Sequence, residues 1–144
     1  MRTFKHVAVL LVLTMGVGSL CVYGASTETL KGTPGSAPQW GWGWLDLEKA
    51  KDFKKGDKLR LTIGGGAKNI FVRLLPDIRR ADAPVGIVGN ATPVPPNRVI
   101  EVSLTQDHPG VQQISVHGGP HPWGRDLGGG NGNATLEKVE LIRP

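Results

Sequence analysis

The chain has 144 residues, with 17 Lys and Arg against 12 Asp and Glu, so its formal net charge is +5 at pH 7. This excess is mild, and the densest basic stretch, KAKDFKK at residues 49–55, is too short for a phosphate-binding stripe, which argues against nucleic acid as a partner. The single cysteine rules out an internal disulfide framework.

Residues 1–25 have the three-part pattern of a secretory signal peptide. Arg2 and Lys5 precede an uncharged run over residues 7–20, and small side chains then stand where signal peptidase cleaves. Cys21 belongs to this segment, because the residue before it is too large for a lipoprotein signal. We therefore expect a cleaved leader rather than an uncleaved anchor, and a mature protein that is secreted or periplasmic and lacks cysteine, as is common for bacterial exported domains. No later apolar run could cross a bilayer, so no membrane contact is expected after cleavage.

Residues 26–39, STETLKGTPGSAPQ, are polar and rich in Gly, Pro, Ser and Thr. Leu30 is their only large apolar side chain, so this composition is typical of a flexible linker. From Trp40 onward, short apolar runs alternate with turn residues. We therefore predict a leader at 1–25, a linker at 26–39 and one folded domain with a modest core at 40–144.

The predicted domain consists of short strands. In the run at 58–63, Leu59, Leu61 and Ile63 alternate with Lys, Arg and Thr, which is the pattern of a strand with one buried face. All runs of this kind together cover residues 45–47, 58–63, 69–76, 85–88, 99–104, 111–117 and 135–142. The one weak helix candidate, residues 47–53, allows a single helical turn. The pattern therefore predicts an all-β, antiparallel β-sandwich of about seven to nine strands.

Four stretches of the predicted domain occur in a characteristic order. They are FKKGDKLRLTIGG at 53–65, NIFVRLLP at 69–76, VQQISVHGGPHPWG at 111–124 and TLEKVELIRP at 135–144. This order, with Phe, two residues and Gly-Asp opening an early strand, resembles the jelly-roll domains of the galactose-binding-domain-like superfamily, which include many carbohydrate-binding modules. The resemblance covers residues 40–144 and implies a jelly-roll fold that binds a glycan without catalysis. Such modules often carry a structural calcium, which Asp46 or Asp57 could help to hold together with backbone carbonyls.

Residues 39–47, QWGWGWLDL, place Trp40, Trp42 and Trp44 at every second position with glycine between them. In an extended strand these rings share one face, and the following leucines point to the other. If the leucines face the core, the rings form an outward aromatic platform for a ligand. The alternative is a bulge or turn that directs at least one ring into the core, because Trp is often partly buried at the end of a sandwich.

A polar sheet face next to a tryptophan predicts a shallow glycan groove. Sugars offer C–H patches that stack on indole rings, and their hydroxyls need planar polar partners. The predicted ligand-binding residues are Trp42, Trp44, Trp123, Arg60, Arg73, Glu101, Gln113 and His117. These residues form one groove only if their strands are neighbours. The competing interpretation is an ordinary solvated sheet face, since half of such a face is polar in any case.

No motif marks a catalytic or metal site. The chain lacks G-x-S-x-G and H-E-x-x-H. His117 and His121 are four residues apart, and only His108 or Asp126 could complete a zinc site with them, so such a site is not expected. Residues 129–137, GGNGNATLE, imitate a calcium-binding repeat, but Ala134 replaces its aspartate and the repeat occurs once, so we expect a flexible loop. No catalytic residue, no metal ligand and no cofactor other than the structural calcium is expected.

Taken together, these patterns predict an exported, non-catalytic module whose partner is a glycan. The alternative is a structural or protein-interaction β-sandwich of the cell envelope, in which the same aromatic rings contact a protein. A small glycan-acting hydrolase is a lesser alternative. It would need paired carboxylates, such as Glu101 with Asp107 or Asp126, and nothing distinguishes these from ordinary surface acids.

Overall fold

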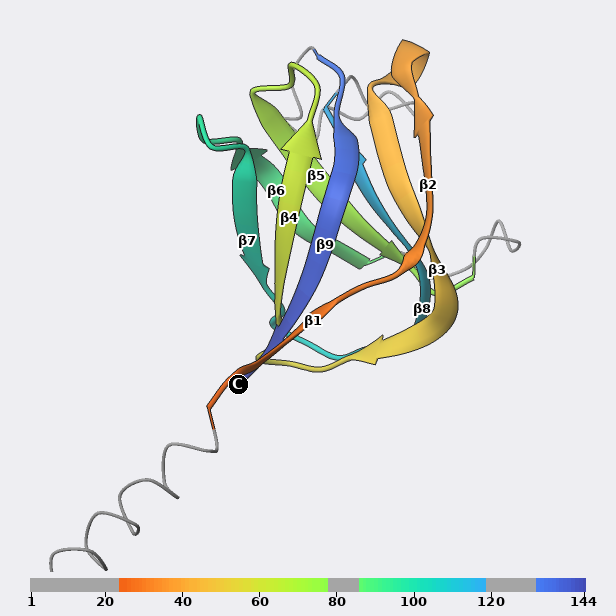
Figure 1. The fold of residues 1–144 in the computed structure, drawn as a ribbon, viewed down its shortest axis with the longest axis vertical. Helices are drawn as coiled ribbons and strands as arrows, with labels where there is room; N and C mark the ends of the chain where they lie inside the picture. Colours follow the sequence, from red (N-terminus) through yellow and green to blue (C-terminus); the bar gives the residue numbers. More distant parts are fainter. Residues whose placement is uncertain (1–23, 78–85, 119–131) are drawn as a thin grey trace, which may run out of the picture.

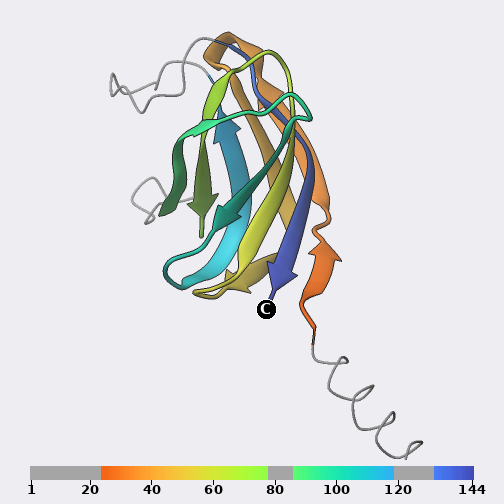
Figure 2. The same cartoon turned by 90° about the vertical axis from the view of Figure 1, so that its left-hand side faces the viewer.

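Two antiparallel β-sheets form the protein, in a computed structural model that describes residues 24–77, 86–118 and 132–144 (Figures 1 and 2). Sheet A contains, in spatial order, β1 (Ser26–Thr29), β9 (Thr135–Arg143), β4 (Lys58–Gly64) and β7 (Val99–Ser103). Sheet B contains β2 (Gly32–Ala37), β3 (Trp42–Phe53), β8 (His108–His117), β5 (Asn69–Leu75) and β6 (Gly86–Pro93). A short 3-10 helix, η2 (Pro38–Trp40), joins β2 to β3. Within the described ranges, no helix has the length and apolar character that crossing a membrane requires.

The chain passes between the two sheets in the manner of a jelly roll. After β3 in sheet B it crosses to β4, returns for β5 and β6, crosses to β7, returns to β8 and ends in β9. The order β1-β9-β4-β7 against β3-β8-β5-β6 is that of an eight-stranded jelly roll, with β2 added at one edge. The predicted all-β, antiparallel sandwich is therefore confirmed.

The core lies between the sheets, where alternate residues of facing strands meet. Leu59, Leu61 and Ile63 of β4 are buried, as their alternation predicts. The core also contains Ile70, Val72, Leu74, Ile114, Val116, Val139 and Leu141. Burial of each such side chain contributes about 1.5–3 kcal/mol of hydrophobic stabilisation. Because side chains alternate along a strand, the intervening residues of β5 and β8 point away from this core.

The predicted linker at residues 26–39 is wrong, because most of it is paired strand. β1 pairs with β9 and β2 pairs with β3, both antiparallel. Between them Leu30 is only 8% exposed and joins the core, and its N–H donates to the carbonyl of Val139 at 2.9 Å. Backbone hydrogen bonds to β9 and β3, together with the burial of Leu30, stabilise this segment as strands although its composition is typical of a linker. The folded domain therefore includes Ser26 and does not begin at Trp40.

Two further segments differ from the sequence-based expectation. Residues 47–53, the weak helix candidate, continue β3, and the pairing of β3 with β8 shifts register between Asp46 and Lys51. β6 extends to Pro93, well beyond the strand predicted at 85–88. β6 is an edge strand, where a proline at the end removes no ladder hydrogen bond that the sheet needs.

Candidate ligand-binding face

Three rows of side chains cross the middle of sheet B on the side away from the core. Strand register places residues of β3, β8 and β5 directly opposite one another, and opposed residues share a face of the sheet. The first row is Trp42, His117 and Phe71, the second is Trp44, Ser115 and Arg73, and the third is Asp46, Gln113 and Leu75. We call these nine residues the outer face. It unites five of the eight predicted ligand-binding residues: Trp42, Trp44, Arg73, Gln113 and His117.

The first row is a contiguous aromatic cluster around His117. The ring of Phe71 stacks on His117 at a centroid distance of 4.5 Å and an interplanar angle of 10°. The ring of Trp42 meets His117 edge-on at 4.4 Å and 62°. His117 is 1% exposed and Phe71 is fully buried, while Trp42 is half-buried. His117 therefore fills the space between the rings of Trp42 and Phe71 and is closed off from solvent.

The glycines between the tryptophans face a crowded interior. A Cβ at Gly43 would lie 2.6 Å from the Cα of Thr135 and 2.8 Å from the carbonyl oxygen of Ala134. Gly41 has a φ of 70°, which favours glycine, and its carbonyl accepts hydrogen bonds from the N–H groups of Gly118 and Ala134. The close approach of β3 to β9 thus requires glycine at position 43.

The tryptophans consequently take the outward side of β3. Trp42 and Trp44 are half-buried on the outer face, and Trp40, at the end of η2, is 51% exposed. The hydrophobic core contains none of these three rings. The alternative in which a bulge directs one ring inward is therefore wrong, because the segment from Trp42 to Asp46 pairs regularly with β8.

The second and third rows combine an indole with polar groups. Trp44 and Asp46 are half-buried, and the amide Nε2 of Gln113 donates to Asp46 Oδ1 at 2.7 Å. Arg73 is only 7% exposed, and this burial lowers the pKa of its guanidinium. Solvent therefore reaches the β3 side of the first two rows and the whole third row, and Trp44 lies there beside the pair formed by Asp46 and Gln113.

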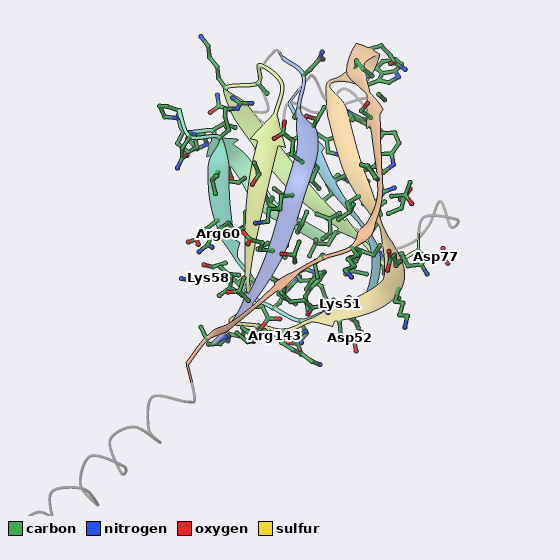
Figure 3. All side chains as sticks on the ribbon, viewed as in Figure 1. Lys51, Asp52, Lys58, Arg60, Asp77 and Arg143 are labelled. Atoms are coloured by element: carbon green, nitrogen blue, oxygen red, sulfur yellow. The ribbon has the colours of Figure 1, made fainter. Side chains whose placement is uncertain are left out.

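Arg60 and Glu101 do not belong to this face. They are opposed on β4 and β7 of sheet A, and the Arg60 guanidinium donates to Glu101 Oε1 from Nη2 at 2.9 Å and from Nε at 3.1 Å. Figure 3 shows Arg60 projecting from the β4 region of the sandwich. Including them in one groove was wrong, because alternation identifies the polar side of each strand but not the sheet to which the strand belongs. The remaining predicted contact, Trp123, lies outside the described residues.

Four residues of the outer face are not among the predicted ligand contacts: Asp46, Phe71, Ser115 and Leu75. The sequence predicts Asp46 only as a calcium ligand, and Phe71 lies in a run, residues 69–76, that has apolar side chains on both faces. The signal for Phe71 was its position, since it alternates with Ile70 and Val72, which point into the core. An aromatic residue on the side of a strand that points away from the core indicates a second, smaller cluster of aromatic side chains on that side.

Nothing in the described ranges forms a metal site. No three His, Cys, Asp or Glu side chains come together there in a way that could hold an ion. The two carboxylates considered for calcium have protein partners. Asp46 accepts from Gln113, whereas Asp57 accepts from the Lys54 N–H at 2.9 Å and lies 3.6 Å from Nε of Arg143.

Ser115 and His117 form a pair that deserves comparison with a catalytic dyad. The Ser115 Oγ and His117 Nε2 are 3.0 Å apart, which is hydrogen-bond distance for a nucleophile and its base. Both residues are buried, with Ser115 4% and His117 1% exposed, so a substrate cannot approach the hydroxyl in this conformation. The hydrogen bond instead fixes the imidazole between the two aromatic rings.

Comparison with known proteins gives one structural similarity. No family model matches the chain, and no curated protein matches it. The solved structure of chitosan-binding module 1, derived from a chitosanase/glucanase of Paenibacillus sp. IK-5, is similar with a TM-score of 0.43 and 10% identity. The similarity covers 84% of this chain and 94% of that module. A similarity of this degree does not identify a ligand for this chain.

Proposed function

We propose that this protein is a non-catalytic glycan-binding module and that the outer face is its binding site. The observation that carries the proposal is the placement of Trp44 beside the pair formed by Asp46 and Gln113, all partly open to solvent on one sheet face. An indole ring suits the C–H face of a sugar, and a carboxylate beside an amide suits its hydroxyls. These are the two kinds of group that sugar recognition needs.

The supporting structure holds these groups in place before a ligand arrives. β3 lies inside sheet B, paired on one side with β2 and on the other with β8. Trp44 rests against the backbone of β2, while Trp42 is supported by His117. Side chains that are already ordered lose little conformational entropy on binding, which favours affinity from a shallow surface.

We further propose that the protein acts outside the cytoplasm, as a secreted or periplasmic module. The support for this is the signal-like pattern of residues 1–25 together with the start of β1 at Ser26, directly after the predicted cleavage region. Cleavage there leaves β1 whole and able to pair with β9.

A second candidate function is docking of a protein partner of the cell envelope, and one observation favours it. Trp40 is 51% exposed, the one large hydrophobic side chain of the described residues that is so open. Exposed tryptophans are frequent anchors of protein interfaces. On this alternative, Trp40 makes the contact and the outer face does not.

Tryptophan fluorescence distinguishes the two functions. The mature protein is titrated with a panel of soluble oligosaccharides, in parallel with Trp44→Ala and Trp40→Ala. Glycan binding at the outer face predicts a saturable change that Trp44→Ala abolishes and Trp40→Ala leaves in place. If the folded protein responds to no oligosaccharide, glycan binding is refuted, and a pull-down from envelope extract with Trp40→Ala as the comparison tests the protein-partner function.

A further inference from the structure

The charged groups of the outer face are few. In its three rows only Asp46 and Arg73 are charged. The neighbouring positions of β2 that share this face, Thr33, Gly35 and Ala37, carry no charge. The sequence of β6 on the other side, GIVGNATP, also contains no charged residue. Among the described residues of these rows, the charged side chains are therefore one acid and one base.

The acid and the base differ in how well a ligand can reach them. Arg73 is 7% exposed in the second row, whereas Asp46 is half-buried in the third row beside β2. The amide of Gln113 orients the Asp46 carboxylate through the 2.7 Å hydrogen bond. A carboxylate accepts several hydrogen bonds, so this contact does not exhaust it. Of these two charges, the one that solvent reaches is therefore the negative charge of Asp46.

The same strand sets two aromatic rings in line with this acid. Trp42, Trp44 and Asp46 occupy every second position of β3 and therefore lie on one side of it. This segment pairs regularly with β8. The line spans about 13 Å at the usual rise of a strand, which is longer than a single sugar ring. An oligosaccharide that lies along β3 would therefore meet both indoles and the carboxylate at once.

From this arrangement we propose that the outer face selects oligosaccharides that carry protonated amino groups over neutral ones, and disfavours those that carry carboxylates. The inference rests on the proposed glycan-binding function. An ammonium group donates charge-assisted hydrogen bonds to Asp46 and is attracted to the faces of indole rings. A sugar carboxylate at the same place meets a like charge, while the positive charge of Arg73 is largely buried.

The test compares three oligosaccharides of equal length: oligomers of glucosamine, of N-acetylglucosamine and of galacturonic acid. Binding to the mature protein is measured by calorimetry at a mildly acidic pH, at which carboxylates are ionised and the sugar amines are protonated. We expect the glucosamine oligomer to bind about tenfold more tightly than the N-acetylated one, and the galacturonate oligomer to bind most weakly. The preference should shrink as salt is added.

Two charge-matched variants locate the effect. Asp46→Asn should weaken binding of the glucosamine oligomer about tenfold and binding of the N-acetylated oligomer clearly less, because an asparagine still offers hydrogen bonds to neutral hydroxyls but has no charge for an ammonium group. Glu101→Gln removes an equal charge from sheet A, on the opposite side of the sandwich, and should change neither. Circular dichroism and thermal unfolding establish that both variants fold.

Each contrary result has its own meaning. Equal affinity for the three oligomers refutes the charge selection and leaves glycan binding in place. Tightest binding of the galacturonate oligomer also refutes the charge selection, and it indicates that the positive charge of Arg73 determines which oligosaccharide binds. An equal loss from Asp46→Asn and Glu101→Gln shows that only overall charge matters, which refutes the role of Asp46. Absence of binding to all three refutes this inference, and the wider oligosaccharide panel then decides whether the proposed glycan-binding function stands.

Discussion

The indole of Trp44 lies across Gly35 of the neighbouring strand. The two residues are directly opposed in the pairing of β2 with β3, and a Cβ at position 35 would overlap the indole ring. The edge strand β2 thus leaves space for the ring that we propose as a sugar platform. Gly35 lies in a segment whose composition is typical of a linker, yet this position requires glycine because the indole of Trp44 on β3 fills the space beside it.

Gly35→Ala should displace the Trp44 ring and weaken glycan binding. Because the obstacle is a side chain at the sheet edge rather than backbone, we expect a small loss of stability and a loss of affinity of about tenfold. The emission maximum of tryptophan and the affinity for an oligosaccharide that binds in the fluorescence titration measure the two effects. Gly66→Ala serves as the control, since a Cβ there has nothing within 4 Å. A changed emission maximum with unchanged affinity in Gly35→Ala would show that Trp44 is not part of the site.

Gly43→Ala should destabilise the fold itself. Its Cβ would meet the backbone of Thr135 and Ala134, which cannot rotate away, so β3 and β9 must separate. Overpacking of this kind typically costs about 1–3 kcal/mol of unfolding free energy. Chemical denaturation measures the loss against Gly66→Ala. A variant as stable as the wild type would contradict the close approach of the two strands.

Leu30→Ala tests whether the segment before Trp40 is part of the domain. Leu30 is buried between β1 and β2, so its truncation should cost about 2–4 kcal/mol, whereas Thr27→Ala on exposed β1 should cost little. Thermal unfolding compares the two variants. A chain that starts at Trp40 should also unfold at a lower temperature than one that starts at Ser26. Equal stability of these two chains would restore the linker interpretation.

Arg98→Ala should loosen the turn between β4 and β5. The Arg98 side chain donates to three carbonyls, from Nε to Ile63 at 3.1 Å, from Nη1 to Ala67 at 2.9 Å and from Nη2 to Gly64 at 3.3 Å. Loss of these charge-assisted bonds in a half-buried place should cost about 2 kcal/mol. Arg98 also has a φ of 60°, which glycine adopts without strain. Arg98→Gly should therefore unfold at a higher temperature than Arg98→Ala, and the reverse order would contradict the strained backbone.

His117→Ala should remove the ring on which Trp42 packs and so weaken glycan binding indirectly, because His117 itself is buried. The imidazole fills the space between Trp42 and Phe71 and is hydrogen-bonded to Ser115, so its truncation leaves a cavity and should cost about 2–4 kcal/mol. His117→Phe retains a ring in this space and should recover most of the stability and of the glycan affinity. Denaturation and binding are measured on both variants. If His117→Phe folds well but binds as poorly as His117→Ala, the imidazole contacts the ligand directly.

Much of the architecture could be predicted from local pattern. The alternation of Leu59, Leu61 and Ile63 identified a strand with one buried face, because an extended chain directs successive side chains to opposite sides. The same reasoning placed the tryptophans opposite Leu45. It failed for β1 and β2, since their strand structure depends on pairing with β9 and β3 and not on their own composition.

The sequence by itself determined the all-β class and the inward side of the central strands, and it placed Trp42 and Trp44 on one side of their strand. The regular pairing of β3 with β8 decided that this side points away from the core. Only the tertiary structure decided which polar strand faces belong together: it placed Arg73, Gln113 and His117 with these rings in sheet B and left Arg60 and Glu101 on sheet A. The physical reason is that alternation is a property of each strand alone. Membership of a sheet depends instead on hydrogen bonds between strands far apart in the chain.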